Sequence, residues 1–150
     1  MAKKQNADIC KFYDVGIVDA NTLRGEVDET LWLLTQGTQV VPIKVEDLLY
    51  LYSETTILRR RILSFPEYGK NRMDSIINTL QMYEPSDIKS YQHVVFLIQT
   101  SKEHPVSVSE LCKLQDITIM FGSTAEINWG IGIDEKLDNE MFFMLVCSKK

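Results

Sequence analysis

The chain contains few residues of the kinds that build metal centres or covalent cross-links. Its 150 residues include three cysteines, Cys10, Cys112 and Cys147, and two histidines, His93 and His104. The cysteines are odd in number and form no Cys-x-x-Cys pair, and neither histidine lies at metal-ligand spacing. These absences exclude a zinc ribbon and a disulfide-stapled miniprotein. We expect the cysteines to be small buried hydrophobes, and we expect neither a metal nor a cofactor.

Long apolar runs and an excess of basic residues are also absent. No stretch of about 18 apolar residues, the length of a membrane span, occurs in the sequence, and the polar N-terminus leads into no signal-peptide core. The formal net charge of −5 opposes binding to nucleic acid or to an anionic membrane. We therefore expect a cytoplasmic protein that binds neither. A length of 150 residues, 45% of them hydrophobic, suits a single domain.

Hydrophobic residues spaced three and four apart predict helices over residues 26–36, 45–52, 71–83 and 108–121. Gly37 lies where the first helix needs a left-handed C-terminal cap. Ser107 and Glu110 fit the capping-box pattern that begins the last helix. The apolar face of the second helix is expected to comprise Val45, Leu48, Leu49 and Tyr52.

Strands are predicted over residues 9–18, 58–65, 94–98, 127–133 and 141–147. The run from Val94 to Ile98 is apolar throughout, which is typical of a strand covered on both faces. Gly130 and Gly132 leave one face of their strand nearly bare, so a neighbouring element, by expectation a helix, must approach it closely. The last two strands are expected to pair as an antiparallel hairpin across the turn 134–140.

The order of elements from residue 58 onward is βαβαββ. This order predicts an α/β (α+β) two-layer sandwich, with a mixed four-stranded sheet and helices on at least one face, preceded by N-terminal helices. Residues 1–150 are expected to form one domain, with 1–25 as an N-terminal extension.

Individual residues give little indication of a nucleotide-binding, catalytic or metal-binding site. No glycine-rich phosphate loop occurs, because Gly130-Ile131-Gly132 lacks a third glycine and lies within a predicted strand. His93 begins a buried strand and His104 precedes Pro105 in a polar turn, so both are expected to be structural or exposed rather than catalytic. The acids of the turn, Asp134, Glu135, Asp138 and Glu140, lack the alternate spacing of a calcium loop and are expected to be solvated.

Three consecutive arginines form the sharpest basic feature. Strand alternation places Arg60 on the face opposite to Arg59 and Arg61. Two interpretations remain open: an edge strand that charge protects from aggregation, or a site for phosphate or RNA.

The C-terminal half resembles a known family when its motifs are taken together. Residues 127–140 contain Trp129-Gly130, then Ile133-Asp134, Leu137 and Glu140, followed by an apolar last strand. This pattern resembles the signature hairpin in the C-terminal domain of FtsZ, the tubulin-like cell-division GTPase. Asn71-Arg72 at a helix start and the segment 106–110 resemble further motifs of that domain. The resemblance implies a stand-alone FtsZ C-terminal-like domain without the GTPase domain, since the glycine-rich nucleotide-binding part is missing.

Residues 27–47 resemble the family's central helix and the loop after it. In the family this loop carries Asn-x-Asp-x-x-Asp, whose acids reach the nucleotide of the next subunit in the filament. Here Pro42, Lys44 and Asp47 stand at those three places, so only the last is kept. A lysine cannot polarise water as an acid does, so the resemblance implies no contribution to GTP hydrolysis.

The resemblance therefore predicts a non-catalytic protein-interaction module, an accessory or regulator of a bacterial FtsZ- or tubulin-like cytoskeleton in cell division. Its partner would be an FtsZ-like filament or a second copy of the chain, as in a self-associating scaffold. The alternative is a small oligomeric enzyme or ligand-binding protein of chorismate-mutase-like fold, with Arg59, Arg61 and Glu140 at sites between subunits. The candidate interaction residues are Lys44, Glu46, Asp47, Arg59 and Arg61.

Overall fold

The computed structural model describes residues 10–18 and 24–150 and centres on one mixed sheet. Its strands are β1 (Cys10–Val18), β2 (Thr38–Val41), β3 (Thr56–Ser64), β4 (His93–Thr100), β5 (Glu126–Ile133) and β6 (Met141–Lys149). They lie in the order β1-β3-β6-β4-β5-β2, with β4 and β5 parallel and all other neighbours antiparallel. The four predicted central strands are confirmed, and β1 and β2 extend the sheet at its two edges.

Part of the expected N-terminal extension belongs to this sheet. Residues 10–18 pair with β3 as β1, as the strand predicted over 9–18 requires. Residues 1–9 and 19–23 lie outside the described residues. The short strand β2 was not predicted, because only four residues separate Gly37 from Pro42 and they carry no clear alternation.

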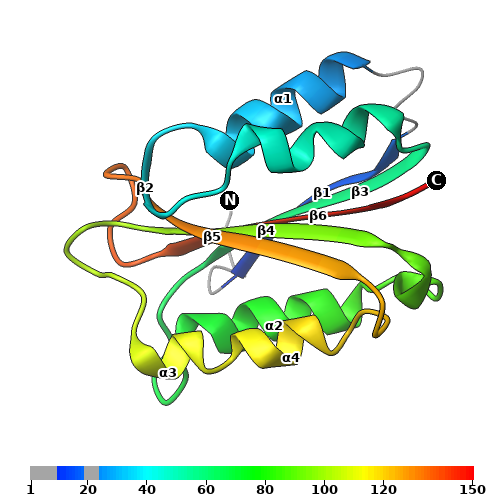
Figure 1. Ribbon diagram of the computed structural model, residues 1–150. Helices are drawn as coiled ribbons and strands as arrows, with labels where there is room; N and C mark the ends of the chain where they lie inside the picture. Colours follow the sequence, from blue (N-terminus) through cyan, green and yellow to red (C-terminus); the bar gives the residue numbers. More distant parts are fainter. Residues whose placement is uncertain (1–9, 19–23) are drawn as a thin grey trace, which may run out of the picture.

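The helical segments are α1 (Arg24–Thr35), η1 (Val45–Ser53), α2 (Arg72–Met82), η2 (Ile88–Ser90), α3 (Val108–Leu111) and α4 (Leu114–Thr118). Figure 1 shows α1 and η1 on one face of the sheet and α2, α3 and α4 on the other. In the residues that the structure describes, no helix is both long and apolar enough to cross a membrane.

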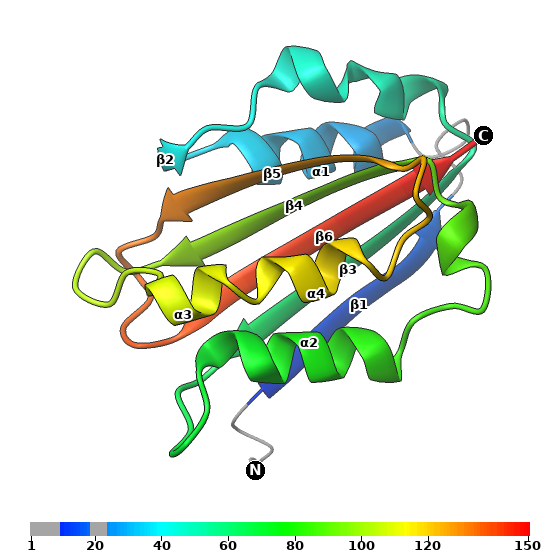
Figure 2. The same ribbon diagram turned by 60° about the horizontal axis from the view of Figure 1, so that its bottom comes forward.

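Each face of the sheet has its own apolar core. Along β4, Val95 and Leu97 pack toward α1 and η1, whereas Val94, Phe96 and Ile98 pack toward α2 and α4. Helices on at least one face were predicted, and the fully buried β4 requires them on both. The domain therefore has three layers rather than the two of a simple sandwich (Figure 2).

The predicted helix 71–83 forms as α2, and its local signals act as expected. The Asn71 side chain accepts from the Asp74 amide at 3.0 Å, while the Asp74 carboxylate accepts from the Asn71 amide at 3.0 Å. Its apolar stripe, Met73, Ile76, Ile77 and Leu80, is buried. Gly37 follows α1 with φ +82°, as its capping position requires.

Two predicted helices differ in form. The segment η1 is a 3₁₀ helix, in which a repeat of three residues places Leu48 and Leu51 inward and leaves Leu49 51% exposed. The predicted helix 108–121 is divided into α3 and α4. The Lys113 amide donates to the Glu110 carbonyl three residues back, which tightens the turn and interrupts the helix.

The predicted β5–β6 hairpin is wrong, because β4 lies between these two strands. A strand that is apolar on both faces is best buried in the middle of the sheet, and β4 pairs with both of its neighbours. The turn 134–140 therefore crosses the end of β4. There the Asp134 amide donates to the Thr100 carbonyl at 3.0 Å, and the Ser101 hydroxyl donates to the Asp138 carbonyl.

Close packing against the bare glycine face of β5 is confirmed, but the approaching element is not a helix. A Cβ on Gly130 would lie 2.7 Å from the carbonyl oxygen of Val41 and 2.5 Å from Cγ1 of Ile43. The end of β2 and the residues after it thus lie directly against β5. This contact holds the start of η1 beside the sheet.

Candidate functional site

A cavity of about 190 Å³ lies where the parallel strands β4 and β5 begin, beside η1. Strand register accounts for its composition: His93, the first residue of β4, lies opposite Glu126 of β5 on one side and Ser148 of β6 on the other. The residues that line the cavity are Asp47, Tyr50, His93, Val94, Glu126, Ile127 and Asn128.

Behind the cavity, His93 is held by a buried carboxylate. His93 Nδ1 lies 2.7 Å from Glu54 Oε1, and the Ser148 hydroxyl donates to the same oxygen at 2.9 Å. Glu54 is 1% exposed, and its Oε2 has no hydrogen-bond partner among the described residues. An ionised carboxylate only accepts, so the contact with an ionised Glu54 requires the proton on Nδ1; the other ring nitrogen, Nε2, lies toward Glu126.

At the mouth of the cavity, His93 Nε2 lies 3.0 Å from Glu126 Oε1. The Glu126 side chain is 81% exposed, so it can turn away from the ring. The Tyr50 ring stacks on the His93 ring with centroids 4.2 Å apart. Burial, and then the negative charges of Glu54 and Glu126, raise the pKa of the Tyr50 phenol, which therefore stays protonated.

The groups around the cavity accept more hydrogen bonds than they donate. Asp47, Glu126, His93 and Tyr50 line the cavity, and the Glu54 carboxylate lies behind the His93 ring. Such a site favours a ligand that carries several N–H donors or a positive charge. Within residues 10–18 and 24–150, no three His, Cys, Asp or Glu side chains are placed together to hold a metal.

The predicted loop residues lie beside this cavity. Lys44 precedes η1, and Glu46 and Asp47 are in its first turn; all three are exposed. Asp47 also lines the cavity. The structure therefore brings Asp47 together with His93, from segments that are far apart in the sequence.

The arginines of β3 do not form a common surface. Arg59 is 3% exposed, and its Nη2 lies 2.6 Å from Glu26 Oε2 while Nη1 donates to the Thr30 hydroxyl at 2.7 Å. Arg59 thus attaches α1 to the sheet and leaves almost no surface for a partner. Arg60 points to the other face and donates to the Tyr83 carbonyl at 2.8 Å, which confirms the predicted alternation.

The structure also bears on two further predictions about the arginines of β3. Arg61 is half-buried, and the strand lies between β1 and β6, so the interpretation of an edge strand protected by charge is wrong. The register also separates Arg59 from Glu140, because Val146 lies opposite Arg59 whereas Met141 lies opposite Ser64. Within one chain, these residues do not form a joint site.

The cysteines divide into two environments. Cys147 is buried in β6, as expected, whereas Cys112 is exposed between α3 and α4. The side chain of Cys10 lies outside the described residues. The expectation of buried cysteines is therefore confirmed for Cys147 and wrong for Cys112.

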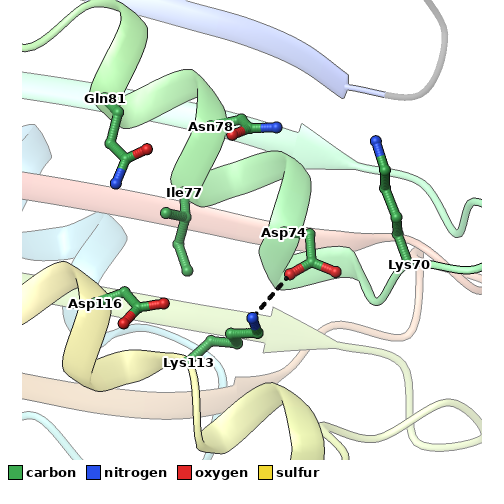
Figure 3. Close-up of a pocket in the computed structure, with 7 residues that line it drawn as sticks. All are labelled: Lys70, Asp74, Ile77, Asn78, Gln81, Lys113 and Asp116. Atoms are coloured by element: carbon green, nitrogen blue, oxygen red, sulfur yellow. Dashed lines mark ion pairs between the residues drawn. The ribbon is translucent and has the colours of Figure 1, made fainter.

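A second hollow, of about 360 Å³, lies between α2 and α4 (Figure 3). Asp74 from α2 and Lys113 from the start of α4 point toward each other across it, with Nζ 3.4 Å from Oδ1. Ile77 forms the apolar part of its wall, and the remaining lining residues are Lys70, Asn78, Gln81 and Asp116. Its charges are of both signs and it contains no buried polar group, so the His93 cavity is the stronger candidate site.

Sequence reasoning missed most of the His93 cavity. Tyr50, Glu54 and Glu126 come from η1, from the residue after it and from the first position of β5. His93 and Glu126 each begin an apolar strand, and parallel pairing in register would have brought them together. That pairing cannot be deduced from local patterns.

The fold has counterparts among solved structures. This chain is similar in fold to part of FtsZ. An empty FtsZ dimer from M. jannaschii matches with a TM-score of 0.62 and 15% identity, over 85% of this chain and 38% of that chain. The W319Y mutant of M. jannaschii FtsZ matches with a TM-score of 0.60 and 17% identity, over the same shares of the two chains.

The resemblance to an FtsZ C-terminal-like domain is thereby confirmed at the level of the fold. The chain spans well under two thirds of the FtsZ chains that it matches, and the rest of FtsZ has no counterpart in these residues. No family model matches the sequence, and a search of curated proteins found no match.

Proposed function

We propose that this FtsZ-like domain is a non-catalytic protein-interaction module, an accessory or regulator of a bacterial FtsZ- or tubulin-like filament in the cytoplasm. The observation that carries the proposal is the exposed start of η1. Here the charged residues Lys44, Glu46 and Asp47 lie next to apolar side chains that solvent also reaches, Val45 at 41% and Leu49 at 51% exposure. We call the exposed side chains of Lys44, Val45, Glu46, Asp47 and Leu49 the η1 surface.

The η1 surface is held rigidly from beneath. Leu48 and Leu51 are fully buried, and Ile43 is 3% exposed. Gln39 accepts from the Ile43 amide at 3.1 Å and donates to the Thr35 carbonyl at 2.6 Å, which fixes the segment that leads into η1. A surface that is already ordered loses little conformational entropy on binding, so this region is suited to recognising a partner.

The comparison with FtsZ supports the choice of partner. One of the similar structures is a dimer of FtsZ, and in the sequence resemblance residues 42–47 correspond to the loop that, in FtsZ, meets the next subunit in a filament. Lys44 stands in place of an acid there. A contact of that kind, without the acids that position water, would bind a filament subunit and leave its nucleotide chemistry unaided.

Co-sedimentation with the polymerised FtsZ-like protein of the same cell tests the proposal. We expect the wild-type chain to pellet with polymer and the variant Glu46→Lys/Asp47→Lys to lose most of this binding. The matched control is Glu135→Lys/Asp138→Lys, which makes the same change of charge in the exposed turn beyond the other end of β5. Failure of the wild type to pellet, with no change in polymer mass, would refute the proposal.

Two other outcomes would favour the alternatives. A stable homo-oligomer that binds no filament, measured by light scattering, would favour a self-associating scaffold. A trimer whose melting temperature rises with a small metabolite would favour a ligand-binding protein or enzyme with sites between subunits, where Arg61 and Glu140 are the polar groups to mutate.

A further inference from the structure

We propose that a cavity at the carboxyl ends of β4 and β5 binds a neutral sugar ring, with the Gln99 amide holding two adjacent hydroxyl groups and Trp32 packing against the apolar face of the ring. This inference goes beyond the proposed function. None of the residues that line this cavity belongs to the η1 surface, so sugar binding and filament binding can be tested separately. We call it the Gln99 cavity.

The Gln99 cavity has a volume of about 330 Å³ and lies where two parallel strands end. Gln99 is the next-to-last residue of β4, and Ile133 is the last residue of β5. Ligands of sheets with parallel strands bind outside the carboxyl ends of those strands. The end of α1, the start of β2 and the turn after β5 complete the wall, so that the lining residues are Trp32, Gln36, Gly37, Thr38, Gln99, Ile133, Asp134, Glu135 and Lys136.

The Gln99 side chain is buried without a protein partner. Gln99 is 6% exposed, yet its amide forms no hydrogen bond with any other residue that the structure describes. Gly132 lies opposite Gln99 in the parallel pairing, and a Cβ on this glycine would be 3.6 Å from Gln99 Nε2. A larger side chain there would lie against the amide, so the glycine leaves the amide open to the cavity that it lines. Because a buried amide without a partner destabilises the fold, its retention indicates a ligand.

The end of α1 contributes an exposed aromatic ring to the same cavity. Trp32 is 62% exposed, although it is a large apolar side chain. The Gln36 amide donates to the Trp32 carbonyl at 2.9 Å, and this four-residue spacing keeps both residues on one side of the helix end. A sugar ring has one face of C–H groups, which packs well against an indole ring. Trp32 therefore supplies the apolar contact that the other lining residues lack.

The hydrogen-bonding groups of Gln99 match two neighbouring hydroxyl groups of a sugar. A glutamine amide presents an acceptor, Oε1, and a donor, Nε2, side by side. One hydroxyl donates to the oxygen while the next accepts from the nitrogen, so both atoms of the amide are satisfied at once. Asp134 Oδ1 accepts from the Lys136 amide at 3.0 Å, which leaves Oδ2 for a third hydroxyl. The half-buried Gln36 amide can bind a further one from the side of α1.

The charge and the spread of the polar groups favour a neutral sugar over two related classes of ligand. Asp134 and Glu135 outnumber Lys136 in the lining, so an acidic or phosphorylated sugar would be repelled. A nucleobase would also stack on Trp32, but all of its hydrogen-bonding groups lie in the plane of the base. The polar side chains here come from the end of α1, from β4 and from the turn after β5. Hydroxyl groups around a sugar ring point in several directions, which suits this arrangement better.

Titration of the ¹⁵N-labelled full chain with D-glucose, D-galactose, D-mannose and N-acetyl-D-glucosamine, followed by NMR, tests the inference. We expect at least one of these sugars to cause saturable shifts at the Trp32 indole N–H and the Gln99 side-chain amide at millimolar concentration. Glycerol, which has adjacent hydroxyl groups but no ring face, should cause none. Adenosine and D-glucuronate represent the two disfavoured classes, and each should bind at least about tenfold more weakly than the best sugar.

Variants then separate the contributions. Gln99→Leu keeps a side chain of similar size without the donor and the acceptor, so sugar binding should weaken about tenfold. Its melting temperature should be unchanged or higher, because an amide without a protein partner is removed from a buried position. Trp32→Ala should also weaken binding about tenfold, with partial recovery in Trp32→Phe. The matched control is Tyr68→Ala, which removes another exposed aromatic ring that does not line the cavity and should leave the affinity unchanged.

Several outcomes would overturn the inference. These are the absence of saturable shifts with all four sugars, unchanged affinity in Gln99→Leu, or tighter binding of adenosine than of any sugar. A lower melting temperature of Gln99→Leu with sugar binding retained would likewise assign the amide a structural role and overturn it. Filament binding is proposed for the η1 surface, so failure of the co-sedimentation assay would refute the proposed function alone.

Discussion

Arg72 and Glu110 form a doubly hydrogen-bonded ion pair, although 38 residues separate them. Arg72 Nε lies 2.9 Å from Glu110 Oε2, and Nη2 lies 2.9 Å from Oε1. Both side chains are buried. The guanidinium thus joins the first turn of α2 to the capping box of α3, and its remaining donors reach the carbonyls of His104, Pro105, Asn139 and Glu140. The three segments that carry the FtsZ-like motifs therefore meet at one side chain.

Replacing Arg72 should cost far more stability than replacing an exposed basic residue. Arg72→Met leaves the Glu110 charge buried and unpaired, so the free energy of unfolding should fall by roughly 3–5 kcal/mol in urea titrations. Arg72→Met/Glu110→Gln should recover part of this loss. Lys113→Met, which breaks only the partly exposed pair with Asp74, should cost less than about 1 kcal/mol. Equal losses in the two single variants would contradict the prediction.

The same ion pair should make stability depend on acid. Burial opposes ionisation of Glu110, but hydrogen bonds from Arg72 and from the Ser107 amide prevail, and the pKa of Glu110 lies below its ordinary value of 4.5. A lowered folded pKa stabilises the protein above the unfolded value, and this contribution disappears as the pH falls through the folded one. The free energy of unfolding should therefore decline below pH 4.5, and more steeply in wild type than in Glu110→Gln. Parallel slopes between pH 7 and pH 3 would contradict this assignment.

The structural elements that the sequence predicted best depend on neighbouring residues. Asn71 and Asp74 are three residues apart, and Ser107 and Glu110 likewise, so each cap is encoded in one turn of chain. The strands that pair with β5 cannot be predicted from neighbouring residues in the same way. Ile133 and Met141 are close in sequence, and this proximity favours direct pairing of β5 with β6. In the structure β4, which is buried on both faces, lies between them.

The candidate site was unpredictable for the same reason. His93, Glu126 and Ser148 become neighbours only through the register of three strands. Glu54, which contacts His93, directly follows η1, a 3₁₀ helix where the sequence pattern favoured an α-helix. Arg59 was proposed as an interaction residue on the surface because it is charged. In the structure it pairs with Glu26 and is buried.

Gly130 should be intolerant of any side chain. Gly130→Ala places a Cβ 2.7 Å from the Val41 carbonyl, a backbone atom that cannot move without disturbing β2, and should destabilise the fold by about 1–3 kcal/mol. Gly25→Ala is the matched control, because nothing lies within 4 Å of its Cβ and the residue is in α1. That substitution should be neutral or stabilise by about 0.5–1 kcal/mol. Thermal unfolding of the two variants distinguishes a local steric effect from a general effect of alanine.

Cys147 and Cys112 should differ sharply in reactivity. Cys147 is fully buried in β6, and burial raises the pKa of its thiol to about 12, while Cys112 is exposed. The thiolate is the reactive form, so at pH 8 iodoacetamide should alkylate Cys112 within minutes and Cys147 only when the sheet opens. Peptide mapping by mass spectrometry, with a sample in concentrated urea as control, should give similar rates for both residues only after unfolding. Because Cys147 lies next to Ser148, which holds Glu54, rapid native alkylation of Cys147 would mean that β6 opens readily and that the carboxylate behind His93 is not rigidly held.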